Sequence, residues 1–178
     1  MDQHPKHHFQ YCPRCSTKGK FDSDQFSFSC PDCGFQFFLN ASAAVTALIF
    51  NKNGELLLTR RGVEPDIGKL DLPGGFIDPE ESAEEALKRE IQEELNLKPL
   101  QIEYYGSFPN QYLFSGTIVY TVDLVFKCQI KDFSAMKFMD DIAGFEFIHP
   151  NNIDIELLPF QSAKNIIKQI QNEDRNSK

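Results

Sequence analysis

The chain has 178 residues, enough for one ordinary domain and a small additional module, and 41% of its residues are hydrophobic, which suffices for a core. Its formal net charge of −8 argues against a general polyanion-binding protein. No run of 18 apolar residues is present, so no membrane span is expected, and the polar N-terminus without an apolar signal region favours a cytoplasmic location.

Two C-x-x-C pairs, separated by fourteen residues, stand near the N-terminus at Cys12, Cys15, Cys30 and Cys33. This spacing resembles a zinc ribbon, in which two turns present four thiolates to a tetrahedral Zn²⁺. Two disulfides or a redox pair are the alternative, and the absence of a secretion signal argues against disulfides. We therefore expect residues 1–39 to form a small domain folded around one structural Zn²⁺.

The ribbon is rich in aromatic residues and carries balanced charge. Its second cysteine pair is surrounded by Phe26, Phe28, Phe35, Phe37 and Phe38. So small a module cannot bury them all, so some should pack on the neighbouring domain or on a second subunit. Three cations and three aspartates lie between the first and last of the four cysteines, which is no nucleic-acid footprint. A ribbon that supports the structure or forms a homodimer is the expectation. The fifth cysteine, Cys128, ends an apolar strand and is expected in the core.

The rest of the chain alternates between strand and helix patterns. Strands are predicted at 44–50, 56–60, 102–107, 117–128 and 145–148, with short extended segments around 70–72. Asn53-Gly54 predicts a hairpin turn between the first two strands. A helix is predicted at 160–170, and residues 173–178 are expected to fray.

The segment between Ser82 and Asn96 predicts a helix with defined ends. Ser82 and Glu85 fit a capping box, and Asn96 fits the left-handed residue that follows a helix. At about 100° per residue, a buried stripe is formed by Ala83, Leu87, Ile91 and Leu95.

Three carboxylates, Glu90, Glu93 and Glu94, overlap the edge of this stripe instead of lying opposite it. Unpaired carboxylates there should lose their charge or disturb packing, and binding of a hard divalent cation such as Mg²⁺ resolves that conflict. The alternative is an ordinary surface helix in which Glu85 and Arg89 form an i,i+4 pair.

These residues resemble the Nudix box. The matching positions are Gly75, Glu81, Arg89, Glu90, Ile91, Glu93, Glu94 and Leu97. Asn96 stands where the family usually has glycine, and asparagine is the best substitute for glycine in a left-handed conformation. Before the box, Thr59-Arg60-Arg61 at the end of a strand and the stretch from Gly68 to Gly75 are also similar to the family.

The resemblance implies an α/β fold, a Nudix α/β/α sandwich with a mixed sheet over residues 40–172, preceded by the ribbon. It also implies hydrolysis of a nucleoside diphosphate linked to another group, with two or three Mg²⁺ or Mn²⁺ ions at the pyrophosphate. Carried over by position, Glu90 and Glu94 would be the principal metal ligands and Glu93 a ligand or base. The Gly75 carbonyl could add a ligand, while Glu81 and Arg89 would pair and orient the cluster.

Four further residues are candidates for the same site. An acidic protein acting on an anionic substrate needs local cations, for which Arg60, Arg61 and Lys69 are available. Asp141 stands where related enzymes often carry a glutamate that serves as catalytic base or additional metal ligand. A solvated loop acid is the alternative for Asp141.

The combination of a four-cysteine ribbon with this box resembles the bacterial NADH pyrophosphatase subgroup. The signature that follows the box in that subgroup is incomplete, because Ser107 and Pro109 match while Asn110 replaces its tryptophan. NADH or NAD, ADP-ribose and nucleotide sugars therefore all stay open as small-molecule substrates. NAD-cap removal from RNA and a non-catalytic module that senses ADP-ribose or NAD are the alternatives.

Overall fold

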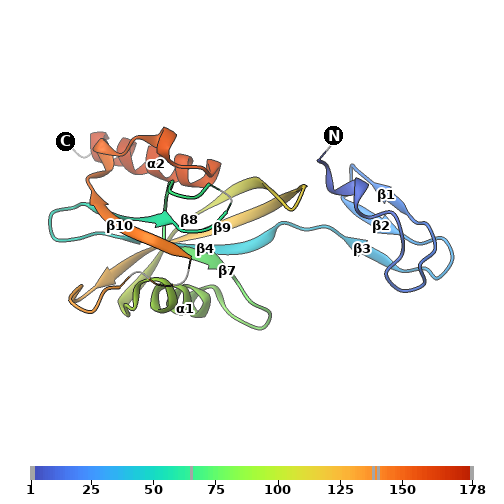
Figure 1. Ribbon diagram of the computed structural model, residues 1–178, viewed down its shortest axis with the longest axis horizontal. Helices are drawn as coiled ribbons and strands as arrows, with labels where there is room; N and C mark the ends of the chain where they lie inside the picture. The colour runs from blue at the N-terminus through green and yellow to red at the C-terminus, as the bar shows by residue number, and fades with distance from the viewer. Residues whose placement is uncertain (1–2, 65, 138, 140, 177–178) are drawn as a thin grey trace. The chain divides into compact units, whose positions relative to one another are not determined.

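The computed structural model describes residues 3–64, 66–137, 139 and 141–176 (Figure 1). It divides into two compact units. Unit 1 contains the N-terminal segment through Ser42 together with Gln111–Tyr120, and unit 2 contains Ala43–Asn110 and the segment from Thr121 onward. Unit 1 therefore takes in a stretch that lies within the expected 40–172 domain.

Unit 1 is built on a small antiparallel sheet, in the order β1 (Lys20–Asp22), β2 (Ser27–Ser29) and β3 (Gln36–Phe38), preceded by the 3-10 turn η1 (Pro5–His7). Its buried centre consists of Cys12, Phe28 and Cys30. Of the aromatic residues around the second cysteine pair, Phe37 and Phe38 stay 40% and 50% exposed.

The segment 111–120 joins this unit through specific contacts. The Ile118 amide donates to the Gln3 carbonyl at 3.0 Å, and the Tyr120 ring meets Phe26 edge-on with centroids 5.5 Å apart. This segment includes the turn between the two longest strands of the chain, β8 (Pro99–Phe114) and β9 (Thr117–Ile130).

Unit 2 places its strands between two helices. Within the described residues they form one sheet in the order β10-β5-β6 and another in the order β7-β4-β9-β8. The remaining bounds are β4 (Ser42–Ile49), β5 (Leu56–Arg61), β6 (Leu70–Asp71), β7 (Gly74–Phe76), α1 (Ala83–Leu95), β10 (Ile142–Ile148), η2 (Pro150–Asn152), η3 (Ile155–Leu157) and α2 (Gln161–Asn176).

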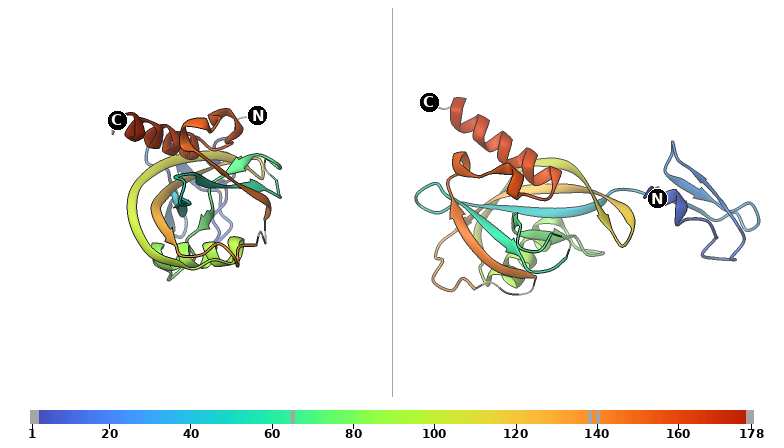
Figure 2. Two further views of the ribbon diagram at one scale, coloured as in Figure 1. Left: turned by 90° about the vertical axis from the view of Figure 1, so that its left-hand side faces the viewer. Right: turned by 45° about the horizontal axis from the view of Figure 1, so that its top comes forward.

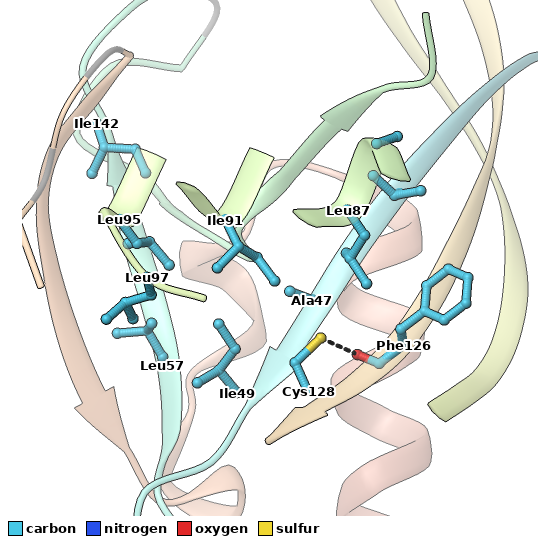
Figure 3. Close-up of a cluster of buried hydrophobic side chains, with 12 residues drawn as sticks. Ala47, Ile49, Leu57, Leu87, Ile91, Leu95, Leu97, Phe126, Cys128 and Ile142 are labelled. Carbon is cyan, nitrogen blue, oxygen red and sulfur yellow. Dashed lines mark hydrogen bonds between the residues drawn. The ribbon is translucent and has the colours of Figure 1, made fainter. Parts of the chain in front are cut away.

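Each helix covers its own side of the strands, as Figures 1 and 2 show. Helix α1 packs on one buried cluster through Ala86, Leu87, Ile91 and Leu95, drawn with the strand residues it meets in Figure 3. Helix α2 packs on a second cluster through Ala163, Ile166, Ile167 and Ile170. The predicted α/β/α architecture is thus confirmed. Cys128 is 5% exposed and belongs to the first cluster, as expected, and its burial raises the pKa of the thiol to about 12.

Element positions agree with the predictions except at some ends. Strand β8 begins three residues earlier and ends seven residues later than the predicted 102–107. Helix α2 continues to Asn176, so residues 173–176 are helical where fraying was expected, and 177–178 lie outside the described residues. No helix in the described part of the chain combines the length and apolarity needed to cross a membrane.

Candidate active site

Helix α1 carries the site and is fixed at its start by a complete capping box. The Ser82 amide donates to Glu85 Oε2 at 2.9 Å, and the Glu85 amide donates to Ser82 Oγ at 3.3 Å. These contacts satisfy two of the amide donors that a helix start leaves without a partner. The hydrogen bonds from Ser82 also lower the pKa of Glu85.

Arg89 is the centre of the carboxylate cluster. Its Nε and Nη2 donate to the two carboxylate oxygens of Glu81 at 3.0 and 2.9 Å, which is a bidentate pair. Its Nη1 donates to Glu90 Oε1 at 2.8 Å and to Glu93 Oε2 at 3.1 Å. The bonds to Glu81 are the largest cause that raises the pKa of Arg89 above its ordinary value, and bonds from Arg89 lower the pKa of Glu81.

The loop in front of the helix holds two of the glutamates close to its backbone. Glu94 Oε2 accepts from the Gly74 amide at 3.0 Å. A Cβ added at Gly75 would lie 2.3 Å from Glu90 Oε1, so the glycine permits the close approach of that carboxylate. The side chain of Glu90 is 14% exposed, whereas that of Glu93 is 49% exposed.

The sequence interpretation missed two backbone groups of this site. One is the Gly74 amide described above, and the other is the Phe76 carbonyl, which accepts from Arg89 Nη2 at 3.0 Å. Backbone groups are present at every residue and leave no side-chain signature in the sequence. Only the paired glycines pointed to a close backbone approach.

The residues suit a divalent cation. Three carboxylates, of Glu81, Glu90 and Glu93, contact one guanidinium, and Glu94 follows on the same helix, so these residues carry more negative than positive charge. Carboxylate oxygens are the ligands that Mg²⁺ and Mn²⁺ prefer. Such a cluster can bind metal and, through it, the oxygens of a phosphate chain.

Asp141 belongs to a segment that contacts the C-terminal end of α1. Its side chain is exposed, and its carbonyl accepts from the Gly62 amide at 2.6 Å. Two residues earlier, the Met139 amide donates to the carbonyl of Glu94 at 3.0 Å. The backbone therefore brings the segment of Asp141 to the last turn of the helix. The preceding residue, Asp140, lies outside the described residues.

The three expected substrate-binding cations all lie against acids. Arg60 pairs with Glu146 and donates to the Gly68 carbonyl at 2.6 Å, and Lys69 lies 3.5 Å from Asp66. Arg61 donates to Asp71 at 3.0 Å and stacks on the Phe160 ring at 5.0 Å. Binding of a substrate phosphate by any of them would require an exchange of these partners.

The four N-terminal cysteines form a cluster that fits one metal ion. Their sulfur atoms all lie within 4.8 Å of one another, with Cys12 and Cys33 at 3.6 Å and Cys15 and Cys30 at 3.5 Å. Tetrahedral zinc with bonds of about 2.3 Å places its sulfur ligands about 3.8 Å apart. The spacing is therefore compatible with the expected zinc ribbon.

A family model described as NUDIX domain matches residues 41–169. Two curated relatives are similar to the chain, each named NAD-capped RNA hydrolase NudC. The protein of Chromobacterium violaceum is 31% identical over 98 residues, which cover 55% of this chain and 36% of that protein. The protein of Deinococcus radiodurans is 30% identical over 118 residues, which cover 64% of this chain and 41% of that protein. The chain spans well under half the length of these relatives.

Solved structures show the same fold. The NUDIX hydrolase from Nitrosomonas europaea has a TM-score of 0.68 at 19% identity, covering 94% of this chain and 93% of that chain. The NUDIX domain of Shewanella oneidensis NrtR, solved in complex with ADP ribose, has a TM-score of 0.59 at 22% identity. The match covers 76% of this chain and 90% of that chain. At these identities the likeness concerns the fold.

Proposed function

The chain belongs to the NUDIX domain family, and from this premise we propose that it hydrolyses the pyrophosphate bond of a nucleoside diphosphate linked to another group, releasing a nucleoside monophosphate. The observation that carries the proposal is the Arg89-centred cluster, in which one guanidinium contacts Glu81, Glu90 and Glu93. All charged positions of the box are intact in the sequence, as a hydrolase requires.

Each residue of the cluster has a proposed role. Glu90 and Glu94 are the principal ligands of two or three Mg²⁺ or Mn²⁺ ions, Glu93 is a ligand or general base, and the Gly75 carbonyl adds an oxygen. When bound, these metals neutralise phosphate charge and lower the pKa of a bound water. Glu81 and Arg89 act on the ligands instead of the substrate, because the bidentate pair holds the guanidinium that orients Glu90 and Glu93.

The proposed cations act on the anionic substrate. Arg60 and Lys69 are half exposed at their side chains, 46% each, so they can exchange their acidic partners for phosphate oxygens. Arg61, with a side chain 20% exposed, is held more firmly by Asp71 and Phe160. We therefore assign the larger part of phosphate binding to Arg60 and Lys69. Asp141 is the proposed additional base or metal ligand.

The proposed substrates are NADH or NAD, ADP-ribose and nucleotide sugars. The names of the two NudC relatives favour a dinucleotide that contains NAD, either free or as an RNA cap. Free dinucleotide is the preferred proposal, because the three cations between Cys12 and Cys33 are offset by three aspartates. We further propose one structural Zn²⁺ on the four cysteines, a cytoplasmic location and a ribbon that contributes to a homodimer.

Glutamine substitutions on α1 test the reaction. Glu93→Gln and Glu94→Gln keep the shape of the side chain and remove its charge, so turnover with Mg²⁺ should fall by about two orders of magnitude or more while the protein stays folded. The matched control is Glu84→Gln, the same change at an exposed position on the same helix. Phosphatase-coupled phosphate release measures turnover, and circular dichroism checks folding. Wild-type turnover in both site variants would refute the proposal.

The same assay ranks the substrates. Preference for NADH would support the ribbon as the feature that identifies the subgroup. Preference for ADP-ribose or a nucleotide sugar would indicate that Asn110 and its neighbours belong to a site for another ligand. Release of nicotinamide mononucleotide from NAD-capped RNA, faster than from free NAD, would favour the RNA alternative. Bound ADP-ribose that stays intact in Mg²⁺ would instead favour the non-catalytic sensor.

A further inference from the structure

Asn96, the position at which the chain departs from the family pattern, makes two side-chain hydrogen bonds. Its Oδ1 accepts from Gln92 Nε2 at 2.9 Å, on the last turn of α1. Its Nδ2 donates to the Ala135 carbonyl at 2.9 Å, thirty-nine residues away in sequence. Asn96 has φ 54° and ψ 37°, the left-handed conformation in which glycine is free of strain. Asparagine at this position therefore adds a side-chain bridge that glycine cannot make.

The bridge belongs to a longer attachment of one loop to the end of the helix. The docked loop, residues 132–137, 139 and 141, follows β9 and ends just before β10. The Lys137 amide donates to the Leu95 carbonyl at 3.1 Å, and the Met139 amide donates to the Glu94 carbonyl at 3.0 Å. The last carbonyls of a helix have no partner within the helix, so the docked loop supplies their donors. Asn96 adds the first bond of this series, at Ala135.

The other end of the docked loop is held by the neighbouring strand. The Gly62 amide, just after β5, donates to the Asp141 carbonyl at 2.6 Å. The docked loop is thus held at two places near its end, at Asp141 by a residue that follows β5 and at Met139 by the helix residue Glu94. The same Glu94 offers its side chain to the Gly74 amide. Any shift of the docked loop along the helix end would change the distance between Asp141 and the carboxylate cluster.

We propose that Asn96 is a positioning residue that holds the docked loop against the end of α1 and thereby sets Asp141 for turnover. The inference rests on the proposed hydrolase function and on the proposed role of Asp141 in it. Asn96 itself contacts the helix and the loop, and it acts through Asp141. The departure from the family glycine is then a functional feature of this chain.

The test uses a substitution that separates backbone from side chain. Asn96→Gly restores the family residue and suits the left-handed conformation, so the thermal midpoint should not fall, while the bond to Ala135 is lost. Asn96→Asp keeps the size and the acceptor for Gln92 but cannot donate to Ala135, so it should behave like Asn96→Gly. The matched control is Gln92→Ala, which removes the bond on the helix side alone and leaves the bridge to the loop.

Two measurements decide the outcome in the full chain. Hydrogen exchange at the Lys137 and Met139 amides should be faster by about tenfold in Asn96→Gly and unchanged in Gln92→Ala. With NADH or ADP-ribose in Mg²⁺, kcat should fall by about tenfold in Asn96→Gly with KM little changed, and this loss should vanish when the substitution is made in an Asp141→Asn background.

Wild-type exchange and kcat in Asn96→Gly would overturn the proposal. So would an equal loss of kcat in the Asp141→Asn background, because Asn96 would then act independently of Asp141. If the wild-type protein turns over none of the probe substrates, the proposed function fails, and the exchange rates alone decide whether Asn96 holds the loop.

Discussion

At the scale of single residues, two adjacent glycines in front of the helix leave room for different neighbours. A Cβ at Gly75 would lie 2.3 Å from Glu90 Oε1, the mobile end of a side chain. A Cβ at Gly74 would lie 2.0 Å from the Val45 carbonyl oxygen, and Gly74 has φ 148°, which side-chain-bearing residues rarely adopt. The missing side chain of Gly75 thus serves the site, whereas the missing side chain of Gly74 serves the fold, although the Gly74 amide also binds Glu94.

Alanine substitutions should separate these two roles. Gly75→Ala should displace Glu90 and lower turnover by about tenfold or more, with a loss of unfolding free energy below about 1 kcal/mol. Gly74→Ala should lower the unfolding free energy by about 1–3 kcal/mol, because a strained backbone and a backbone clash must be relieved. Urea unfolding together with turnover checks both variants. A reversal, with Gly75→Ala the less stable and Gly74→Ala silent, would contradict this assignment.

The raised pKa of Asp71 predicts an effect of pH on the unfolding free energy. Its burial raises the pKa to about 6 from the ordinary 3.8, in opposition to hydrogen bonds from the Leu72 amide and Arg61. Between these two pH values Asp71 binds more protons in the folded state than in the unfolded state, so its contribution to the unfolding free energy falls as pH rises from about 4 to about 6 and is constant above that. The difference of about two pKa units corresponds to about 3 kcal/mol.

Denaturant unfolding from pH 4 to pH 8 measures this contribution. In Asp71→Asn the unfolding free energy should fall less between pH 4 and pH 6 than in the wild type. Loss of the pair with Arg61 can lower the unfolding free energy at every pH without changing this expectation. The control is Asp66→Asn, at a half-exposed acid paired with Lys69 across three residues, which should keep the wild-type slope. Equal slopes in the wild type and in Asp71→Asn would show that another group causes the pH dependence.

The charged members of the cluster could be predicted from the sequence, because their residue types and spacing define the box. The partners of Arg61 could not be predicted in the same way. Asp71 and Phe160 lie ten and ninety-nine residues further along the chain, and only the folding of β5, β6 and the segment before α2 brings them to Arg61. A cation near a predicted site in sequence is therefore weak evidence for contact with the substrate.

At the scale of elements, both ends of α1 could be predicted because local chemistry sets them. The N-cap at Ser82 with its capping box and the left-handed Asn96 are confirmed. Three members of the predicted stripe, Leu87, Ile91 and Leu95, are fully buried, whereas Ala83 is only partly buried. Ala86 is fully buried and was not predicted. Both features depend on residues within one or two turns of each other.

The cap at Ser82 should be measurable by two substitutions. Ser82→Ala removes the acceptor for the Glu85 amide and should lower the unfolding free energy by about 1 kcal/mol. Glycine is a better N-cap residue than alanine, so Ser82→Gly should lower the unfolding free energy by only a few tenths of a kcal/mol. Urea unfolding of both variants gives the comparison. Equal losses would contradict the expectation, because they would show that the backbone preference for glycine at the cap contributes nothing and that the lost Ser82 side chain accounts for the whole effect.

The length of β8 could not be predicted from its own residues. Its side chains do not alternate cleanly between buried and exposed, and Gly106, Pro109 and Asn110 are residue types that strands disfavour. Its extended conformation depends on pairing with β9, the next strand in the sheet. Such pairing is non-local, so periodicity within the segment does not reveal it.

At the scale of the whole molecule, unit 1 should need bound Zn²⁺ to stay folded. The described centre of this unit contains two cysteines and one phenylalanine, which is little core for its size. Removal of Zn²⁺ should therefore increase amide exchange in residues 3–42 and 111–120, while the clusters of unit 2 keep their protection. Mass spectrometry of exchanged peptides measures this, and metal analysis should give one Zn²⁺ per chain.

Two cysteine variants make the zinc prediction specific. Cys15→Ser removes one sulfur of the cluster and should abolish zinc retention, whereas Cys128→Ala, in the core of unit 2, should retain it. Full protection of unit 1 after zinc removal would contradict the prediction. The chain contains no tryptophan, so intrinsic tryptophan fluorescence cannot report on this transition.

The family and the fold could be predicted because the box and the cysteine pairs are compact patterns in the sequence. The composition of unit 1 could not, because nothing near Ile118 or Tyr120 indicates contact with Gln3 or Phe26. These pairs lie more than ninety residues apart.

Because unit 1 combines the N-terminal segment with Gln111–Tyr120, we expect that the N-terminal segment cannot be exchanged alone. A recombination event that exchanged residues 1–39 between relatives would leave the recipient's own hairpin turn facing a foreign surface. Residues on the two segments should therefore change together across lineages, and a working chimaera would have to carry both.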